Sequence, residues 1–247
     1  MTAVTNYFDN FDVVGYRFGD NEDAVLYNNL SQYVDIIDLL KDNVSFYNNY
    51  TVQSGERPDT LSYRLYGTVD YYFTFFLLND KLRKQGWPIF STEITALKAS
   101  KYPYRTLTTT TDIAQIFNPG DQFEGLTSGT TGTVIKRNLD LGQVVYDSGG
   151  NNLNSGETIT YLDAEFGTSI AVVRDDNYQY DSVHHYEDAD GIIQDIDPHT
   201  YTIPSGYVPV TYAERLESAN DSLREIRVLR PDVVGDIVAE FFAFHKG

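Results

Sequence analysis

The stretch that decides the fold is residues 50–88, YTVQSGERPDTLSYRLYGTVDYYFTFFLLNDKLRKQGWP. A short β-type run at its start leads into a polar turn at residues 53–55. Pro58 then stands in the first turn of a helix, where its missing N–H would have no intrahelical partner anyway. Leu61 and Leu65 are four residues apart, so they share one face of that helix.

The second half of the stretch predicts another short helix and a returning strand. Gly67 stands where glycine, which tolerates a positive φ, caps the C-terminus of a helix. The aromatic density of residues 70–79 predicts a second helix that is buried on more than one side. We expect the closing strand between residues 95 and 106, so the predicted order is β-α-α-β.

This order is the plan of a LysM module, and five residues match the pattern of that motif. Its glycine, its threonine–leucine pair and its tyrosine–glycine end correspond to Gly55, Thr60, Leu61, Tyr66 and Gly67. LysM modules elsewhere bind N-acetylglucosamine polymers in a shallow groove. The resemblance therefore keeps one alternative function open, a protein that binds peptidoglycan or chitin.

A more particular resemblance covers residues 6–94. The lead-in NYFDNFDVVGYRFG, the run GERPDTLSYRLYGTVDYYFTFFLLND and the GWP that follows it are similar to the LysM-like-domain baseplate wedge subunit of contractile-tailed (myovirus) bacteriophages. The later run SANDSLREIRVLRPDVVGDIV resembles the same family. The resemblance implies a structural, non-enzymatic chain that joins neighbouring wedges around the hub, about six copies in each baseplate.

The same family also implies partners and a location. The partners would be other baseplate wedge proteins and the hub or sheath-initiating tail proteins. The chain would be part of the virion, in the tail baseplate, after assembly in the host cytoplasm. No nucleic acid, membrane or cofactor is expected.

Composition and charge agree with these expectations. Without cysteine, disulfides and thiolate metal sites are excluded. No apolar run reaches the roughly 20 residues that span a bilayer, and the N-terminus has no secretory pattern. The formal net charge is −18, which disfavours binding to phosphate-rich nucleic acid.

The charge is unevenly placed along the chain. Residues 56–105 hold eight basic and five acidic side chains, whereas residues 138–214 hold Arg174 against fourteen acids. Solubility explains an acidic stretch, and docking of acidic on basic surfaces of neighbouring subunits is the sharper alternative. The 20 tyrosines and 14 phenylalanines likewise suit small cores and protein interfaces.

The fold class predicted is α+β, with four segments. Residues 1–48 form an N-terminal arm with a helix near 23–42, and residues 49–110 form the LysM-like domain. Residues 111–210, with short β-rich runs and glycine-rich turns, predict a small barrel or sandwich. Residues 211–247 form a C-terminal docking segment with a helix, a strand at 225–229 and a last helix that Pro231 opens.

Three motifs resemble catalytic or metal sites, and each is incomplete. TSGTTGT at residues 127–133 matches the phosphate loop of adenylate-forming enzymes, but Val134 and Ile135 stand where that family has proline and lysine, and Lys136 comes one place late. DSGG at 147–150 lacks the preceding glycine of a protease nucleophile loop, and all four histidines come after its serine. The cluster 184–191 misses the first and last ligands of a calcium loop. The sequence therefore predicts neither an enzyme nor a metal site.

The candidate site residues are accordingly interface residues. The basic side chains of the LysM-like segment and its tryptophan would face a partner, and the apolar stripe of the last helix would dock. An equally weighted alternative is that this helix packs on its own domain. The candidates are Arg64, Lys81, Arg83, Lys84, Trp87, Ile237 and Phe241.

Overall fold

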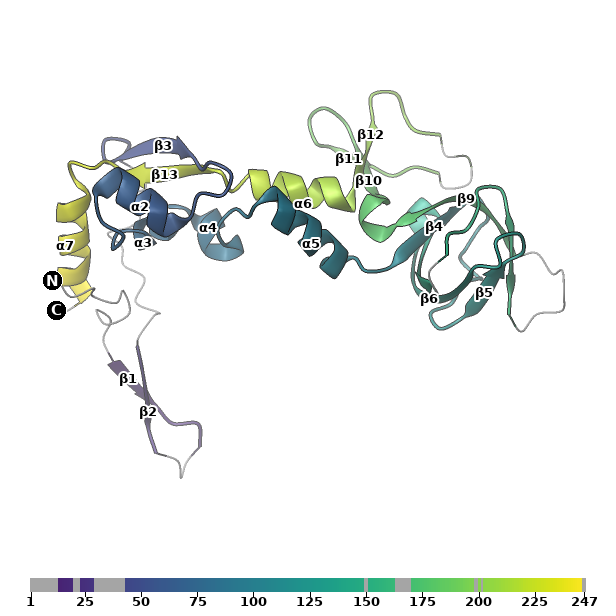
Figure 1. Ribbon diagram of the computed structural model, residues 1–247, viewed down its shortest axis with the longest axis horizontal. Coiled ribbons are helices and arrows are strands. Elements are labelled where there is room, and N and C mark those ends of the chain that lie inside the picture. Colours follow the sequence, from purple (N-terminus) through teal and green to yellow (C-terminus); the bar gives the residue numbers. More distant parts are fainter. Residues whose placement is uncertain are drawn as a thin grey trace. The chain divides into compact units, whose positions relative to one another are not determined.

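The computed structural model describes residues 13–19, 23–28, 43–148, 151–162, 170–197, 200 and 202–245. Helices and strands are both present, so the α+β class is confirmed, and the strands include a closed six-stranded barrel (Figure 1). The chain divides into two compact units. Unit 1 comprises Met1–Phe90 and Asn220–Gly247, and unit 2 comprises Ser91–Ala219. This division differs from the four consecutive segments predicted, because unit 1 is built from both ends of the chain.

Unit 1 contains a two-stranded antiparallel sheet whose strands are far apart in sequence. Strand β3 (Tyr47–Thr51) pairs with β13 (Glu225–Leu229), with Tyr47 opposite Leu229. The closing strand expected at residues 95–106 was therefore wrong. That segment holds the end of helix α5 (Ser91–Lys101) and the start of barrel strand β4 (Arg105–Thr109).

Three short helices of unit 1 follow β3, namely α2 (Pro58–Tyr66), α3 (Phe73–Leu78) and α4 (Asp80–Gln85). Pro58 begins α2 and Gly67 ends it, with a φ of 73° and its N–H bonded to the carbonyl of Tyr63, as the sequence indicated. Gly55 has a φ of 83°, and a Cβ there would lie 2.1 Å from the ring of Phe90. Only glycine fits this turn.

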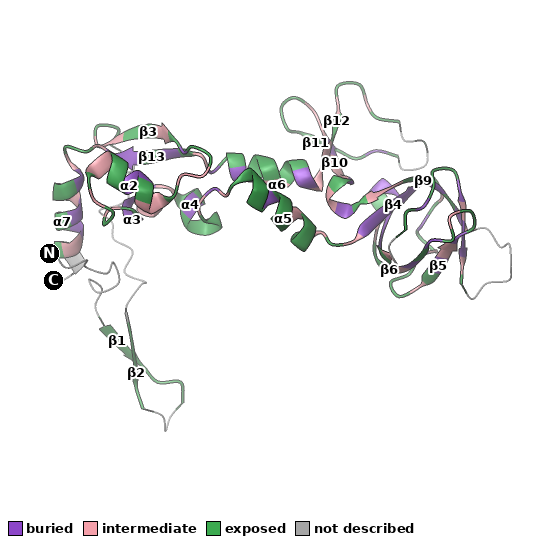
Figure 2. Ribbon diagram, in the orientation of Figure 1, coloured by how far each residue is buried: buried purple, intermediate pink, exposed green. Residues whose placement is uncertain are grey.

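Two apolar clusters fill unit 1. The first packs α2 and α3 on the sheet and includes Leu61, Phe75 and Ile226, with Leu65 only partly buried at its margin. The second packs α3 against β13 and the last helix, α7 (Val234–His245), through Phe73, Val238 and other apolar side chains. Figure 2 shows that the buried residues of β13 and α7 face the interior of this unit.

The N-terminal arm contains a β-hairpin. Strand β1 (Val13–Tyr16) pairs antiparallel with β2 (Val25–Asn28). The helix predicted near residues 23–42 was wrong over residues 23–28, where Val25–Asn28 form β2. The rest of that prediction falls on residues 29–42, outside the described residues.

Unit 2 is dominated by the barrel, with strand order β4-β7-β6-β5-β8-β9. Besides β4, its strands are β5 (Gln122–Gly125), β6 (Thr131–Asn138), β7 (Gln143–Ser148), β8 (Thr158–Tyr161) and β9 (Ala171–Tyr178). Gly132 of β6 is required here, because a Cβ would lie 2.4 Å from the ring of Tyr146. The barrel alternative of the sequence prediction is thus confirmed, and β4 belongs to it.

A second, three-stranded sheet lies against the barrel within unit 2. Its order is β11 (Ile193–Gln194), β10 (Val183–Glu187) and β12 (Val208–Thr211). The side chain of Gln143 on β7 donates a hydrogen bond of 2.9 Å to the carbonyl of Val183. Two short 3-10 turns connect strands that are consecutive in sequence: η2 (Leu139–Leu141) joins β6 to β7, and η3 (Gln179–Asp181) joins β9 to β10. Helix α6 (Tyr212–Asp221) follows β12 directly.

Candidate functional site

The basic residues predicted as an interface are placed on α2 and α4, and two of them have acidic partners. Arg64 of α2 pairs with Glu56 and contacts the hydroxyl of Tyr50. Arg83 of α4 pairs with Asp80 at 2.9 Å. The positive charge of these two arginines is therefore compensated within unit 1.

Two lysines of α4 remain as a smaller basic surface. Lys81 and Lys84 are three residues apart on an exposed part of this helix (Figure 2), so they lie on the same side of it. Within the part of the chain that the structure describes, neither lysine forms an ion pair. Of the four basic residues predicted, Lys81 and Lys84 are therefore the two whose charge is not compensated by an ion pair in the described residues.

Trp87 packs inside unit 1. Its ring centroid lies 5.9 Å from those of Phe75 and Phe76. Its indole N–H donates a 2.6 Å hydrogen bond to the carbonyl of Glu56. A tryptophan followed by proline is compatible with either an interface or a core, and here its surroundings make it part of the core.

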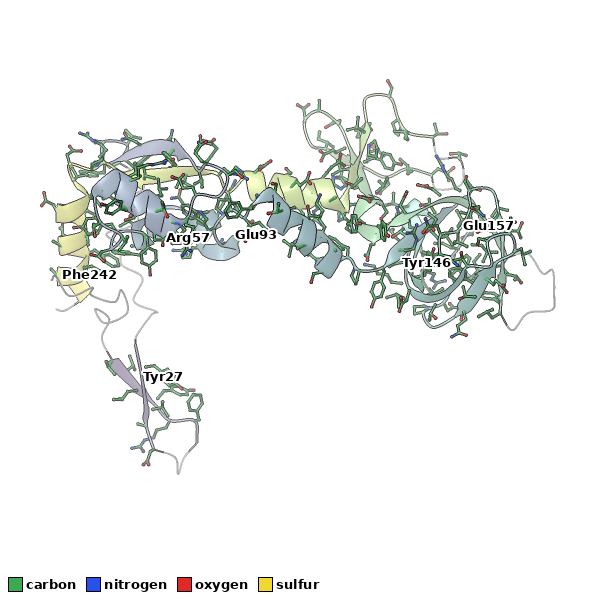
Figure 3. The ribbon with its side chains drawn as sticks, in the orientation of Figure 1. Tyr27, Arg57, Glu93, Tyr146, Glu157 and Phe242 are labelled. Atoms are coloured by element: carbon green, nitrogen blue, oxygen red, sulfur yellow. The ribbon has the colours of Figure 1, made fainter. Side chains whose placement is uncertain are left out.

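The apolar stripe of α7 also turns inward. Phe241 is 4% exposed, and its ring centroid lies 6.0 Å from that of Phe73. Ile237 is partly buried against the same cluster. Phe242, labelled in Figure 3, lies 5.5 Å from Phe73 by ring centroids. Of the two alternatives for the last helix, the described contacts correspond to packing on its own domain.

A hollow of about 250 Å³ with a mixed polar and apolar lining lies beside α4 and β13. The side chain of Asn79 builds one wall: its carbonyl oxygen accepts the N–H of Arg227 and its amide donates to the carbonyl of Arg227, both at 2.8 Å. The side chain of Asn79 thereby satisfies the backbone groups of Arg227 on β13. Charged residues of both signs line the hollow, namely Asp80, Lys81, Glu225 and Arg227.

The β1–β2 hairpin presents a surface that the sequence analysis missed. The register places Val14 opposite Tyr27 and Tyr16 opposite Val25, so these four side chains share one face. Phe18 contacts both tyrosines edge-on, with its ring centroid 5.1 Å from that of Tyr16 and 6.1 Å from that of Tyr27. Figure 3 labels Tyr27 on this hairpin. All five are exposed, with Phe18 at 65%. The alternating VVGYRF run was the available signal.

The TSGTTGT motif forms the turn between β5 and β6, and a carboxylate of the barrel occupies its donors. Glu157, buried and labelled in Figure 3, accepts hydrogen bonds from the Ser128 N–H at 2.8 Å and the Ser128 hydroxyl at 2.9 Å. The hydroxyl of Thr130 donates to the carbonyl of Asn152. These groups, which would bind phosphate in an adenylating enzyme, here hold the turn to the barrel.

The remaining two motifs have structural surroundings as well. Asp147 and Ser148 lie at the end of β7, and the two glycines after them fall outside the described residues. Asp188 accepts the N–H groups of Asp190 and Ile192, which closes the turn between β10 and β11. Among the described residues, no group of three histidine, aspartate or glutamate side chains could hold a metal ion.

A search for membrane spans finds no helix in the described residues that is long and apolar enough to cross a bilayer. Comparison with known protein families finds no family model that matches the chain, and comparison with curated protein sequences finds no significant match. The residues above therefore carry the functional argument alone.

Proposed function

We propose that this chain is a structural component of a contractile phage tail baseplate, a wedge subunit that joins neighbouring wedges around the hub. The observation that carries the proposal lies within the region of resemblance. There, α2 and α3 pack on the sheet of β3 and β13, and the arm before β3 holds a hairpin with exposed aromatic side chains. The matching glycines also stand at the turns of this unit.

The hairpin supports an architectural function because it should need a partner surface to be stable. A single two-stranded hairpin is marginally stable in water, and here Val14, Tyr16 and Tyr27 are each more than two-fifths exposed. Tyrosine and phenylalanine are enriched where proteins bind one another. A neighbouring subunit that covers these exposed side chains would stabilise the hairpin. Permanent assemblies commonly bury more than about 2,000 Å² at such an interface.

The lysines of α4 would contribute mainly to the choice and rate of association. Exposed charges at the rim of an interface change encounter rates more than final affinity. The partners would be other wedge proteins and hub or sheath-initiating tail proteins. About six copies would be present per baseplate, in a virion assembled in the host cytoplasm.

The decisive experiment removes the hairpin surface and follows assembly. In a phage or reconstituted tail system, the double variant Tyr16→Ser, Tyr27→Ser should fold but fail to join wedges. Tyr63→Ser is the matched control, because Tyr63 is 64% exposed on α2 and lies outside the hairpin. Normal baseplates from the double variant, seen by electron microscopy, would reject the hairpin as the joining surface.

A second assembly variant tests the lysines. Lys81→Glu with Lys84→Glu should leave thermal melting unchanged and slow wedge joining, most strongly at low salt. Wild-type assembly rates at low salt would remove the α4 surface from the proposal. Genes for sheath, tube or other wedge proteins beside the gene for this chain would support its assignment to a contractile phage tail.

The alternative function is binding to peptidoglycan or chitin, and the hollow beside β13 is the observation that favours it. The polar part of its lining, which includes Asp80 and Glu225, offers hydrogen-bonding groups to a sugar, and its leucines offer an apolar surface. A pull-down on purified sacculi separates the two functions. The structural proposal expects weak or absent retention, and micromolar binding that Asp80→Ala abolishes would favour the glycan-binding alternative.

A further inference from the structure

Four side chains of unit 2 form a continuous hydrogen-bonded chain between α6 and β10. The Nη1 atom of Arg215 lies 2.7 Å from Nε2 of His184. Nδ1 of His184 lies 2.8 Å from Nδ1 of His185, and Nε2 of His185 lies 3.2 Å from a carboxylate oxygen of Glu187. Arg215 belongs to α6 and the other three to β10, so the chain links two elements.

The two histidines meet because β10 is irregular at this point. Adjacent residues of a regular strand point to opposite faces, so the two side chains would not meet on a regular β10. The pairing of β10 with β12 shifts register between Val183 and His185. A bulge of this kind re-aims side chains, and it brings the two imidazole rings to a centroid distance of 5.0 Å.

The geometry allows one arrangement of protons. Arginine can only donate, so Nε2 of His184 must accept from Arg215 and carry no proton. The proton of His184 then lies on Nδ1 and is donated to Nδ1 of His185. His185 in turn carries its proton on Nε2 and donates it to Glu187. Every donor faces an acceptor when both histidines are neutral.

A further proton breaks this arrangement. On His184 it would have to occupy Nε2, where an N–H would face the N–H of Arg215. On His185 it would occupy Nδ1 and face the Nδ1–H of His184. Either event sets two donors against each other, and protonation of His184 also places its positive charge against that of Arg215, which is unfavourable in a partly buried site.

The surroundings of His184 oppose its protonation. Its pKa is lowered from 6.5 by burial, then by the positive charge of Arg215, by His185 and by Lys136 of β6. From α6, the ring of Tyr212 packs edge-on at 4.8 Å. Glu214 of the same helix is bonded to the N–H and hydroxyl of Thr211, the residue before α6. The carboxylate that faces the chain is therefore Glu187, beyond His185.

We propose that this chain of side chains is a pH-sensitive latch, in which protonation of His184 releases Arg215 and loosens the first turns of α6 from β10. The latch goes beyond the structural function proposed above and does not depend on it. Because the pKa of His184 is lower in the folded state, its stabilising effect is full above about pH 6.5. The effect is lost as the pH falls through the folded-state value. Acidification thus opens the latch.

Hydrogen exchange of the full-length protein at pH 7.5 and pH 5.5 tests the latch. After correction for intrinsic exchange rates, the protection of amides 212–219 should fall at the lower pH. Each unit by which the pKa is lowered corresponds to about a tenfold change in the closed-to-open ratio. His184→Gln is the main variant, because its amide oxygen can accept from Arg215 and does not titrate.

In His184→Gln the protection of α6 should no longer depend on pH. The control His245→Gln, which removes a histidine of α7 in unit 1, should behave as the wild type does. Arg215→Ala should show low protection of α6 at both pH values. Equal protection of wild-type α6 at the two pH values would overturn the proposal. So would an unchanged pH response in His184→Gln, and an NMR titration of His184 with a pKa above 6.5.

Discussion

An arginine, a carboxylate and a tyrosine meet in the barrel, and the same three kinds of side chain meet again in unit 1. In the barrel, the carboxylate of Asp176 is fully buried and accepts three kinds of donor. These are the guanidinium of Arg105 at 3.0 Å, the hydroxyl of Tyr146 at 2.9 Å and the N–H of Leu153 at 2.9 Å. Burial and the neighbouring Asp176 both raise the pKa of Tyr146.

In unit 1, the corresponding group is more open to water. Arg64 is 53% exposed at its side chain, and its partner Glu56 is 7% exposed. The hydroxyl of Tyr50 donates to Glu56 at 2.9 Å, and burial followed by Glu56 raises the pKa of Tyr50. The chemistry of the two groups is alike, and the solvent access of the cation differs.

The difference teaches where an ion pair stabilises a fold. Removing one partner of a buried pair leaves an uncompensated charge and costs about 3–5 kcal/mol. An exposed pair contributes about 0–1 kcal/mol, because water and salt replace the partner. The barrel group should therefore control the stability of unit 2, while the unit 1 group orients side chains at a surface.

Asp176→Ala should have the largest effect, a loss of about 3–5 kcal/mol in the free energy of unfolding of the barrel. It removes the acceptor of Arg105, Tyr146 and Leu153 together. Urea unfolding monitored by hydrogen exchange of the barrel amides measures the loss. The neighbouring and exposed Asp175 is the control, and Asp175→Ala should stay within about 0.5 kcal/mol of the wild type. Equal losses for the two variants would contradict the comparison.

Tyr146→Phe should have an intermediate effect. It removes one hydrogen bond to a charged acceptor, which contributes about 1.5–3 kcal/mol, and leaves Asp176 bonded to Arg105 and Leu153. Tyr50→Phe is the matched change in unit 1 and should cost less, because water reaches the site. A larger loss for Tyr50→Phe than for Tyr146→Phe would reverse the argument from burial.

Arg64→Ala should change the stability of unit 1 by less than about 1 kcal/mol. Glu56 keeps hydrogen bonds from the Tyr50 hydroxyl at 2.9 Å and the Gln53 N–H at 3.1 Å. The chain has one tryptophan, Trp87, and it packs in unit 1. Its fluorescence during urea unfolding therefore follows this unit, and a shift that corresponds to 2 kcal/mol or more would show that the exposed pair is structural.

Deletion of residues 91–219 should have the smallest effect on unit 1. The side chain of Asn220 bonds both the N–H and the carbonyl of Ile89, at 2.8 and 3.3 Å, so the two ends of unit 1 already meet. A short glycine–serine linker between Phe90 and Asn220 should preserve the unfolding midpoint reported by Trp87. Loss of cooperative unfolding in this shortened chain would show that unit 1 depends on unit 2.

Local patterns predicted local structure well. Pro58 begins α2 and Gly67 ends it, as predicted, because each residue acts through its own backbone geometry. The strand at Glu225–Leu229 and the barrel likewise followed from alternation and turn residues. The partner of β3 could not be read in this way, because β13 lies beyond the whole of unit 2 in sequence. Pairing between remote strands leaves no local signal.

The candidate surface was predicted in part. The exposure of Lys81 and Lys84 follows from their charge, but neither charge nor composition shows that Arg64 meets Glu56 across a turn. The same limit applies to Trp87 and Phe241, since an aromatic residue suits a core and an interface equally. The hairpin was missed because its VLYN strand also fits the spacing of a helix.

The pairing of β3 with β13 sets an order of events during synthesis. The ribosome releases β3 early, but its partner is made only after every residue of unit 2. Domains generally fold as units during synthesis, which proceeds at about 5–20 residues per second. The barrel can therefore fold before the second strand of the unit 1 sheet has been made. A nascent chain that stops before Glu225 cannot close this sheet. Completion of translation thus becomes a checkpoint that keeps unfinished copies from presenting a finished unit 1.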